Sequence, residues 1–379
     1  MKLILCLALS AILVCSCGKS GGSSNPNGSN NPNDPNNPDN PNVPKYTQMK
    51  QLSTGVNYAC GLDLNSNVRC IGQNYDGQFG DGTMNSESST STNQNINNAV
   101  SVASGGTSVC SLKKDSTVWC SGSNKYGELG NGTNIDSSVP VQVKNITNFV
   151  QISAGTNGFS CGVTSMGDAY CWGSLADRSS PFNINNSNIP IQIKNVHNFK
   201  SVSVGVLDVY GVTSDGNVYV LNDQSVGEQP TQIQGLSNIT SVSSSGLNTC
   251  ALSNIGSIYC FGYNNYGQLG NGENVDSATP VLVKNISNFV QVSAGGMTTC
   301  GVTSTGDGYC WGLGSTGALG NNSQVDSNIP VKVSNINNFS SISVGAGIAC
   351  GLDTKNMSWC WGSKFLTTSI NPVPYQLKF

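Results

Sequence analysis

The segment at residues 299–320, TCGVTSTGDGYCWGLGSTGALG, reads as two strands joined by a tight turn. One strand begins near Cys300, and the chain returns through Cys310 after a three-residue turn that ends in Gly306. Glycine at that place is typical of a hairpin whose last turn residue adopts a positive φ. This register places Cys300 opposite Cys310. Because side chains alternate along a strand, Tyr309 points to the other face of the hairpin.

The same hairpin recurs along the chain, with its two cysteines always ten residues apart. First cysteines follow one another at intervals of 50 or 51 residues where the series is unbroken. One further copy carries Tyr210 and Val220 at the two cysteine positions, so both thiols are missing together, as paired function predicts. The chain therefore contains seven copies of one unit, which is typical of a repeat architecture. The six pairs are Cys60 with Cys70, Cys110 with Cys120, Cys161 with Cys171, Cys250 with Cys260, Cys300 with Cys310, and Cys350 with Cys360.

Composition favours an all-β domain. The chain has 379 residues, a formal net charge of −3 and a pI near 5.1, with 10% charged residues and 45 glycines. Short alternating segments separated by Gly, Asn and Ser turns predict strands, and no sustained 3.6-residue apolar spacing follows the N-terminal segment. The acidic balance, without a basic stripe, argues against nucleic acid as a partner.

The N-terminus reads as an export signal. Residues 1–16 combine Lys2 with an apolar run too short to span a bilayer, which predicts a signal peptide. The sequence VCSC at residues 14–17 resembles a bacterial lipobox, so we expect Cys17 to become the lipidated N-terminus. Ordinary secretion, with Cys17 as a bystander, is the alternative. Of 15 cysteines, two leave with the signal and one is lipidated, which leaves twelve to pair.

These features predict a lipid-anchored protein of the bacterial cell envelope, where disulfides persist. Gly18 follows the lipidated cysteine in place of the Asp that marks inner-membrane retention, which favours the outer membrane. Residues 17–44 are rich in Asn, Pro, Ser and Gly, so we expect the lipidated cysteine to be followed by a disordered tether that reaches at most about 80 Å. The folded part is predicted at residues 45–379.

Each full copy predicts about four strands, as residues 289–333 illustrate. Seven four-stranded units suggest a solenoid or a closed propeller. The first copy lacks a preceding Pro-x-x-Val strand, and the tail at residues 373–379 matches residues 329–333. We therefore predict a seven-bladed β-propeller closed by pairing of the C-terminal strand with the N-terminal blade.

The recurring pattern resembles the regulator of chromosome condensation repeat. The likeness is clearest at residues 250–272 (CALSNIGSIYCFGYNNYGQLGNG) and 110–132 (CSLKKDSTVWCSGSNKYGELGNG), and it extends over nearly all of residues 45–379. That family implies seven-bladed propellers, and the cysteine-paired form is similar to secreted bacterial members. The eponymous protein is a nucleotide exchange factor, but this chain has an export signal and no long insertion to act as an exchange wedge. Because fold does not fix function, we carry no exchange activity over.

Several residue patterns have two interpretations. The cysteine pairs could be metal ligands or redox thiols. However, ten-residue spacing supplies two ligands per unit and His197 stands alone, so we predict disulfides worth about 2–3 kcal/mol each. The repeated aromatic residues could stack on carbohydrate, but a repeated apolar position more often packs between units. They are Tyr170, Trp172, Tyr259, Phe261, Tyr309, Trp311, Trp359 and Trp361.

The Asn- and Asp-rich loops at residues 131–136, 271–276 and 321–326 each offer one or two carboxylates, too few for calcium, and such side chains usually form turns. No nucleophile–base pairing stands out, although an acid pair could meet across units. We therefore predict no metal, no cofactor and no enzymatic activity.

The irregular copies are the candidates for specific contacts, because loops carry function on a rigid scaffold. Relaxed constraint is the equal alternative. The leading hypothesis is a monomeric, non-enzymatic platform that binds an unknown protein partner and reaches the membrane through its N-terminal lipid. An envelope glycan-binding protein or hydrolase with carboxylates at the central channel, and a structural spacer, are the alternatives. The candidate binding residues are Asp177 and Arg178 in the third copy and Asp223 and Glu228 in the fourth.

Overall fold

The computed structural model describes residues 47–85, 87–92, 96–174, 186–206, 208–221, 230–244, 246–363 and 369–379. The chain divides into two units, Met1–Lys45 and Tyr46–Phe379, and the described residues all belong to the second. Every regular element in them is a β-strand. Within this part of the chain there is no helix with the length and hydropathy needed to cross a bilayer.

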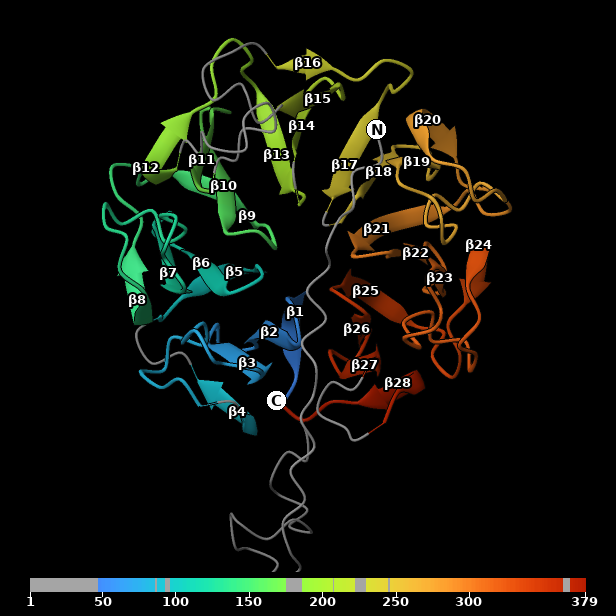
Figure 1. The fold of residues 1–379 in the computed structure, drawn as a ribbon, viewed down its shortest axis with the longest axis horizontal. Helices are drawn as coiled ribbons and strands as arrows, with labels where there is room; N and C mark the ends of the chain where they lie inside the picture. Colours follow the sequence, from blue (N-terminus) through green and yellow to red (C-terminus); the bar gives the residue numbers. More distant parts are fainter. Residues whose placement is uncertain are drawn as a thin grey trace, which may run out of the picture. The chain divides into compact units, whose positions relative to one another are not determined.

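Seven four-stranded sheets form the second unit, and each is built from four consecutive antiparallel strands arranged around a common centre (Figure 1). The innermost strands are β1 (Met49–Thr54), β5 (Ala99–Ser104), β9 (Phe149–Ala154), β13 (Phe199–Val204), β17 (Ile239–Ser244), β21 (Phe289–Gly295) and β25 (Phe339–Val344). The second strands are β2 (Tyr58–Asp63), β6 (Ser108–Lys113), β10 (Phe159–Thr164), β14 (Val209–Thr213), β18 (Asn248–Ser253), β22 (Thr298–Thr303) and β26 (Ile348–Asp353). The third strands are β3 (Val68–Gly72), β7 (Val118–Gly122), β11 (Ala169–Gly173), β15 (Val218–Leu221), β19 (Ile258–Gly262), β23 (Gly308–Gly312) and β27 (Ser358–Gly362). The outer strands are β4 (Glu87–Thr92), β8 (Ser137–Gln142), β12 (Ser187–Gln192), β16 (Thr231–Gln232), β20 (Ser277–Leu282), β24 (Ser327–Lys332) and β28 (Asn371–Gln376). The predicted seven-bladed, all-β propeller is therefore confirmed.

The cysteine hairpin is the second and third strand of each blade. Cys300 of β22 faces Cys310 of β23, and Gly306 in the turn has φ of 83°. In the fourth blade, Tyr210 faces Val220 in the same register. The repeated hairpin of the sequence is thus one structural unit, placed in the middle of every sheet.

Each of the six predicted cysteine pairs is bonded within its own blade. Their Cα–Cα distances of 4.0–4.1 Å belong to the close, non-hydrogen-bonded kind of cross-strand pair. Because the twelve sulfur atoms are bonded in pairs and buried, they are not available as metal ligands. The disulfides join Cys60 to Cys70, Cys110 to Cys120, Cys161 to Cys171, Cys250 to Cys260, Cys300 to Cys310, and Cys350 to Cys360.

The predicted way of closing the ring is wrong. The C-terminal strand β28 pairs with β27 and completes its own blade, while the first blade takes its outer strand from β4. The prediction assumed that a Pro-x-x-Val strand is carried into the following unit. It is instead the fourth strand of its own sheet, so no blade lacks a strand for the tail to supply.

Serine side chains on the innermost strands link neighbouring blades, and the last blade is joined to the first in the same way. Ser343 Oγ accepts the N–H of Thr54 at 3.1 Å, as Ser293 Oγ accepts that of Val344 at 3.0 Å. Ala103 occupies this position in the second blade. The other such bonds span 2.8–3.1 Å and run from Ser53 to Ser104, Ser153 to Val204, Ser203 to Ser244 and Ser243 to Ala294. The ring is thus closed by the interactions that join its other blades.

The two ends of the unit also meet. Thr47 Oγ1 donates to the carbonyl of Phe379 at 2.6 Å, and Met49, Leu377 and Phe379 are buried in one apolar cluster. Packing at this junction is close, because a Cβ added to Gly345 would lie 2.4 Å from the carbonyl oxygen of Gly55. Burial of apolar side chains between the ends adds a hydrophobic contribution to the hydrogen-bonded closure.

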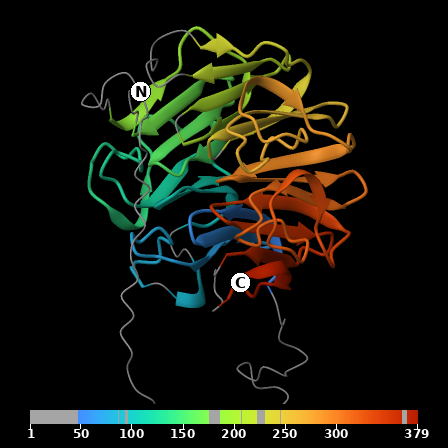
Figure 2. The same cartoon turned by 45° about the vertical axis from the view of Figure 1, so that its right-hand side comes forward.

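The blade ring has two different faces, which the oblique view of Figure 2 helps to follow. The loop face carries the connections from first to second strands and from third to fourth strands. The turn face carries the hairpin turns between second and third strands, and the inner strands begin there, because antiparallel order alternates the ends. These two names are kept below.

Candidate protein-binding loop face

Buried asparagines fix the loops between third and fourth strands. In the second blade, Asn124 Oδ1 accepts the N–H of Leu129 at 2.9 Å, and its Nδ2 donates to the carbonyls of Thr133 at 3.0 Å and Ile135 at 3.1 Å. Asn264 makes the equivalent bonds in the fifth blade. A buried amide that satisfies several backbone groups holds a loop in one conformation, so these loops are built surfaces.

Aspartates close the same loops. Asp136 Oδ1 accepts the N–H of Asn124 at 2.7 Å, Asp276 accepts that of Asn264 at 2.7 Å, and Asp326 accepts that of Gly314 at 2.8 Å. Asn131, Asn271 and Asn321 each accept the N–H two residues ahead at 3.0–3.2 Å, so the prediction that side chains of these loops make turns is confirmed for these asparagines. No group of three or more His, Cys, Asp or Glu side chains suited to a metal occurs among the residues that the structure describes.

Three of these loops are tied to the following blade by a tryptophan. The indole Nε1 of Trp172 donates to the carbonyl of Glu128 at 2.8 Å, Trp311 to that of Gln268 at 3.0 Å and Trp361 to that of Ala318 at 2.9 Å, all between adjacent blades. All three indoles are buried. The prediction that these positions form core between blades is confirmed, and carbohydrate stacking on these three residues is ruled out by their burial.

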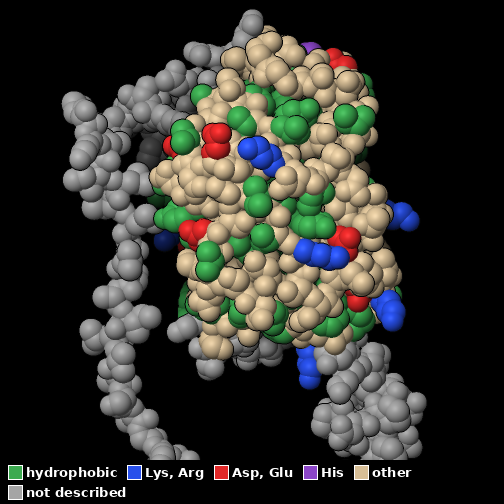
Figure 3. Space-filling view, turned by 90° about the vertical axis from the view of Figure 1, so that its right-hand side faces the viewer, with side chains coloured by type: hydrophobic (Ala, Val, Ile, Leu, Met, Phe, Trp, Pro, Cys, Tyr) green, Lys and Arg blue, Asp and Glu red, His purple; other side chains and the backbone are tan. Residues whose placement is uncertain are grey.

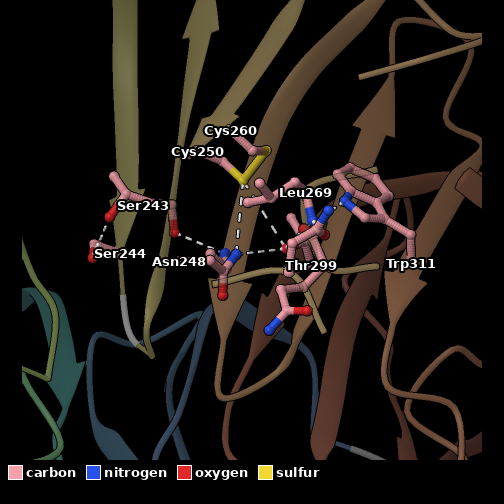
Figure 4. Close-up of a disulfide and its surroundings, with 12 residues drawn as sticks. Ser243, Ser244, Asn248, Cys250, Cys260, Leu269, Thr299 and Trp311 are labelled. Carbon is pink, nitrogen blue, oxygen red and sulfur yellow. Dashed lines mark hydrogen bonds between the residues drawn. A yellow bond between two sulfur atoms is a disulfide. The ribbon is translucent and has the colours of Figure 1, made fainter. Parts of the chain in front are cut away.

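A polar cluster lies beside the Cys250–Cys260 disulfide, between the fifth and sixth blades (Figure 4). Asn248 Nδ2 donates to Thr299 Oγ1 at 3.0 Å, and Thr299 Oγ1 donates to the carbonyl of Gln268 at 3.0 Å. Asn248 Oδ1 and Gln268 Nε2 are buried without a hydrogen-bond partner.

Large apolar and aromatic side chains are exposed on these fixed loops. Ile135, Val275 and Val325 occupy the same loop position in three blades and are 74%, 69% and 72% exposed. Tyr75 is 67% and Tyr126 is 43% exposed in the loops of the first two blades. Ordered loops that present apolar side chains to solvent are typical of protein-binding surfaces. Sequence reasoning missed these residues, although the apolar position just before the loop aspartate repeats.

The loop face is acidic. Lys125 is the single lysine or arginine in the described residues of its loops, whereas carboxylates recur around the ring. The field at this face therefore favours a cationic partner. The acidic residues of the described loops are Asp76, Asp81, Glu128, Asp136, Asp208, Glu273, Asp276 and Asp326.

The sequence-predicted binding residues lie elsewhere in the chain. Asp177 and Arg178 fall between β11 and β12, and Asp223 and Glu228 fall between β15 and β16, all outside the described residues. Cys17 is outside them as well. The connections to which the four candidates belong join third to fourth strands, which is the class of connection that forms the loop face.

The inner strands contain no acidic residue that could serve the alternative function, a hydrolase with carboxylates at the centre of the ring. None of the seven contains Asp or Glu, and the polar side chains there are mostly serine, threonine and glutamine. Gln51 hydrogen-bonds the N–H and carbonyl of Val102 at 3.0 and 3.1 Å, and Gln151 does the same to Val202. The wall of the channel in these strands is therefore occupied with joining blades and supplies no carboxylate pair.

The comparisons with known proteins agree with this architecture. Residues 115–161, 256–302 and 305–352 match the model of the regulator of chromosome condensation (RCC1) repeat, and residues 239–268 match a second model of the same description. A search of curated proteins finds no match to the chain.

Solved propellers resemble the chain over most of its length. Prp20p from Saccharomyces cerevisiae is 18% identical with a TM-score of 0.74, over 88% of this chain and 87% of that one. Human WBSCR16 is 17% identical with a TM-score of 0.70, over 79% and 85%. At such identities the likeness shows the fold. The chain is therefore a seven-bladed β-propeller that carries regulator of chromosome condensation repeats and a disulfide in six of its blades.

Proposed function

We propose that the protein is a non-enzymatic platform that binds a protein partner through its loop face. The observation that carries this proposal is the set of exposed apolar side chains on hydrogen-bonded loops, such as Ile135, Val275 and Val325. A rigid surface loses little conformational entropy on binding, so apolar contacts made there contribute more of their free energy to affinity. The acidic field around them favours a partner with a basic surface.

Propellers of this architecture bind proteins in yeast. The structure of Prp20p is described with its binding properties to Gsp1p and histones, and another structure shows Kap60 bound to yeast RCC1 (Prp20). The low identity carries neither partner over to this chain. It supports the more general inference that a propeller of this kind can serve as a docking surface for proteins.

We further propose that Cys17 is lipidated and that residues 17–44 tether the propeller to the bacterial cell envelope, at the outer membrane. The six disulfides indicate an oxidising compartment outside the cytoplasm. Asp177, Arg178, Asp223 and Glu228 are proposed to contribute to the same loop face, because the connections that contain them join third to fourth strands.

The test compares two exposed valines on opposite faces. Val275, on the loop face, is 69% exposed, and Val290, at the start of an inner strand on the turn face, is 57% exposed. A photo-crosslinking residue at each position, used on intact cells, should capture one defined protein from position 275 and not from 290. Val275→Asp should then weaken binding of that purified protein at least about 10-fold, whereas Val290→Asp should not.

Three outcomes would contradict the proposal. Capture from position 290 with none from 275 would move the partner to the other face. Unchanged affinity of Val275→Asp would remove the apolar loops from the interface. Envelope-polymer turnover that disappears on substitution of loop-face acids, with folding intact, would favour the hydrolase instead.

A further inference from the structure

A ring of bulged residues surrounds the common centre of the seven sheets on the turn face, here called the mouth. In each inner strand the register shifts between the first and third residues, which leaves the second residue as a β-bulge. In the first four blades these residues are Lys50, Val100, Val150 and Lys200, in that order around the ring. All four are exposed, and the two valines are each 52% exposed. Bulges re-aim side chains, so this mouth is a shaped surface.

The hairpin turns extend this surface outward. Met166 at the tip of the third-blade turn is 74% exposed, and Lys114 is exposed in the second-blade turn. Figure 3 looks onto the perimeter on the side of β20 and β24, away from the first four blades, where a few lysine and arginine side chains and scattered hydrophobic patches interrupt a polar surface. We name the six residues of this surface the basic–apolar arc: Lys50, Val100, Lys114, Val150, Met166 and Lys200.

Acids near the arc are already engaged. Asp63 accepts from Arg69 Nε at 3.0 Å, Asp115 pairs with Lys113 at 3.5 Å, and hydrogen bonds from Thr213 and Asn217 reach Asp215. Within the described part of the chain, no ion pair involves the three lysines of the arc, and Lys50 Nζ donates to the hydroxyl of Ser66 at 2.9 Å. The three lysine charges of the arc are therefore not taken up in ion pairs, although two nearby acids, Asp215 with its Thr213 and Asn217 hydrogen bonds and Asp168 beside His197, also lie on this face.

A hollow of about 450 Å³ opens inside the arc between the first two blades. Lys50 and Val100 both line it, together with Ser66 and Ser101. An ammonium and hydroxyls beside an apolar wall match a phosphorylated headgroup attached to an acyl chain. This pairing of charge with apolar area is what an anionic lipid surface recognises.

The chain enters the propeller on this face. Met49 N–H donates to the carbonyl of Asn356 at 2.9 Å, and Gln48 Nε2 donates to that of Lys355 at 3.1 Å, both in the hairpin turn of the seventh blade. Any anchor N-terminal to residue 47 is thus connected at the turn face. The loop face, with its carboxylates, would be repelled by anionic lipid.

We propose that the turn face docks on an anionic lipid surface through the basic–apolar arc, which leaves the loop face directed away from the membrane toward a protein partner. The tethering part of this inference rests on the proposed lipid anchor. Each lysine near an anionic surface changes the partition coefficient about 5-fold, so three lysines orient a tethered domain without holding it irreversibly.

The test uses the full-length protein mixed with vesicles of phosphatidylethanolamine and phosphatidylglycerol, or of phosphatidylcholine alone. A membrane-impermeant lysine-acylating reagent is applied, and labelling at each lysine is measured by mass spectrometry. Lys50, Lys114 and Lys200 should be labelled at least about 3-fold more slowly on the anionic vesicles, whereas Lys125 on the loop face should not change. The difference should disappear in about 0.5 M NaCl, where charges are screened within roughly 4 Å.

A variant separates charge from packing. Lys50→Gln combined with Lys200→Gln should abolish the slower labelling of Lys114, and Lys125→Gln should leave it intact. Equal labelling on both kinds of vesicle would overturn the proposal, as would protection of Lys125 in place of the arc. Protection that requires an envelope protein extract and ignores lipid charge would also overturn it, because a protein would then cover this face.

Flotation of the vesicles distinguishes this inference from the proposed anchor. If the protein floats with phosphatidylcholine vesicles but the lysines of the arc are not selectively protected on anionic vesicles, the lipid on Cys17 is supported and the docking is refuted. If the lysines of the arc are selectively protected on anionic vesicles but the protein does not float with phosphatidylcholine vesicles, the docking is supported and the lipid anchor is refuted.

Discussion

The fourth blade allows the contribution of one disulfide to be measured by adding it. Tyr210 and Val220 face each other at the positions that carry bonded cysteines in the other blades, where the Cα atoms lie 4.0–4.1 Å apart. We therefore predict that Tyr210→Cys combined with Val220→Cys closes a seventh disulfide in an oxidising compartment. The bond would enclose a loop of about eleven residues, for which the loop-entropy relation gives about 2.8 kcal/mol at 25 °C.

The same substitution removes packing. Tyr210 is buried, and its ring lies 5.6 Å from that of Phe261 in an edge-to-face arrangement. Loss of a buried aromatic ring costs roughly 2–4 kcal/mol when a smaller side chain remains. The two effects nearly cancel, so the double-cysteine variant should unfold at or slightly below the urea concentration that unfolds the wild type. This balance explains how the fourth blade can dispense with its disulfide.

The matched control combines Tyr210→Cys with Val220→Ala, which loses the same ring and cannot form the bond. Urea unfolding followed by tryptophan fluorescence should place the double-cysteine variant about 2.8 kcal/mol above this control. Mass spectrometry after alkylation should find no free thiol at the two introduced positions of the double-cysteine variant. Equal stability of the two variants with the bond closed would refute the loop-entropy reasoning, and two free thiols would refute the equivalence of the registers.

Three further predictions concern stability. Burial raises the pKa of Glu128, so between its unfolded and folded pKa values the folded state binds more protons, and the stability of the protein falls as pH rises through that window. Glu128→Gln should remove this fall, so the stability of the variant relative to the wild type, measured by urea unfolding, should grow from pH 4 to pH 7. A relative stability that shrinks over this range would contradict the predicted direction. Ser343→Ala should cost about 1 kcal/mol of stability, because it deletes one hydrogen bond that closes the ring. Gly345→Ala should cost about 1–3 kcal/mol, because the new Cβ is forced against the neighbouring blade. Thermal unfolding measures both losses, and a larger loss for Ser343→Ala than for Gly345→Ala would contradict the prediction. Trp311→Phe should cost about 1–3 kcal/mol because its indole is buried and hydrogen-bonded, and the same change at the partly exposed Trp359 should cost less; equal losses would argue against a special role for the interface between blades.

The sequence could predict the hairpin because its evidence is local. Cys300 and Cys310 lie symmetrically about the turn, and Gly306 ends it, so the sequence predicts that the two cysteines face each other. The structure shows this register. The way in which the ring closes could not be predicted from local evidence, because a repeating sequence does not show at which residue one sheet ends and the next begins. Whether Pro330 lies in the outer strand of one blade or begins the next depends on pairing across the sheet, and β24 pairs with β23.

The candidate site was less predictable for a related reason. In the sequence, the loop that contains Val275 is notable for its side-chain oxygen atoms, and in the structure Asp276 of this loop accepts a hydrogen bond that closes the loop. Periodicity tells which positions are apolar in every copy, but it does not tell which of them face the next blade. Trp311 and Val275 both repeat, yet one is buried and the other is 69% exposed. Only the packing of the neighbouring blade separates the two cases.

Repetition also explains why the overall charge of the chain describes neither of its two faces. Every copy sends the same segment to the same face, so a bias in one segment becomes a property of a whole face. An aspartate precedes three of the outer strands, and Asp136, Asp276 and Asp326 each bond to their own loop and add negative charge to the loop face. At the bulge positions, Lys50 donates to the hydroxyl of Ser66 and Lys200 is exposed, and both place cations on the turn face. A net charge of −3 averages two surfaces of opposite character, and a partner meets one surface at a time.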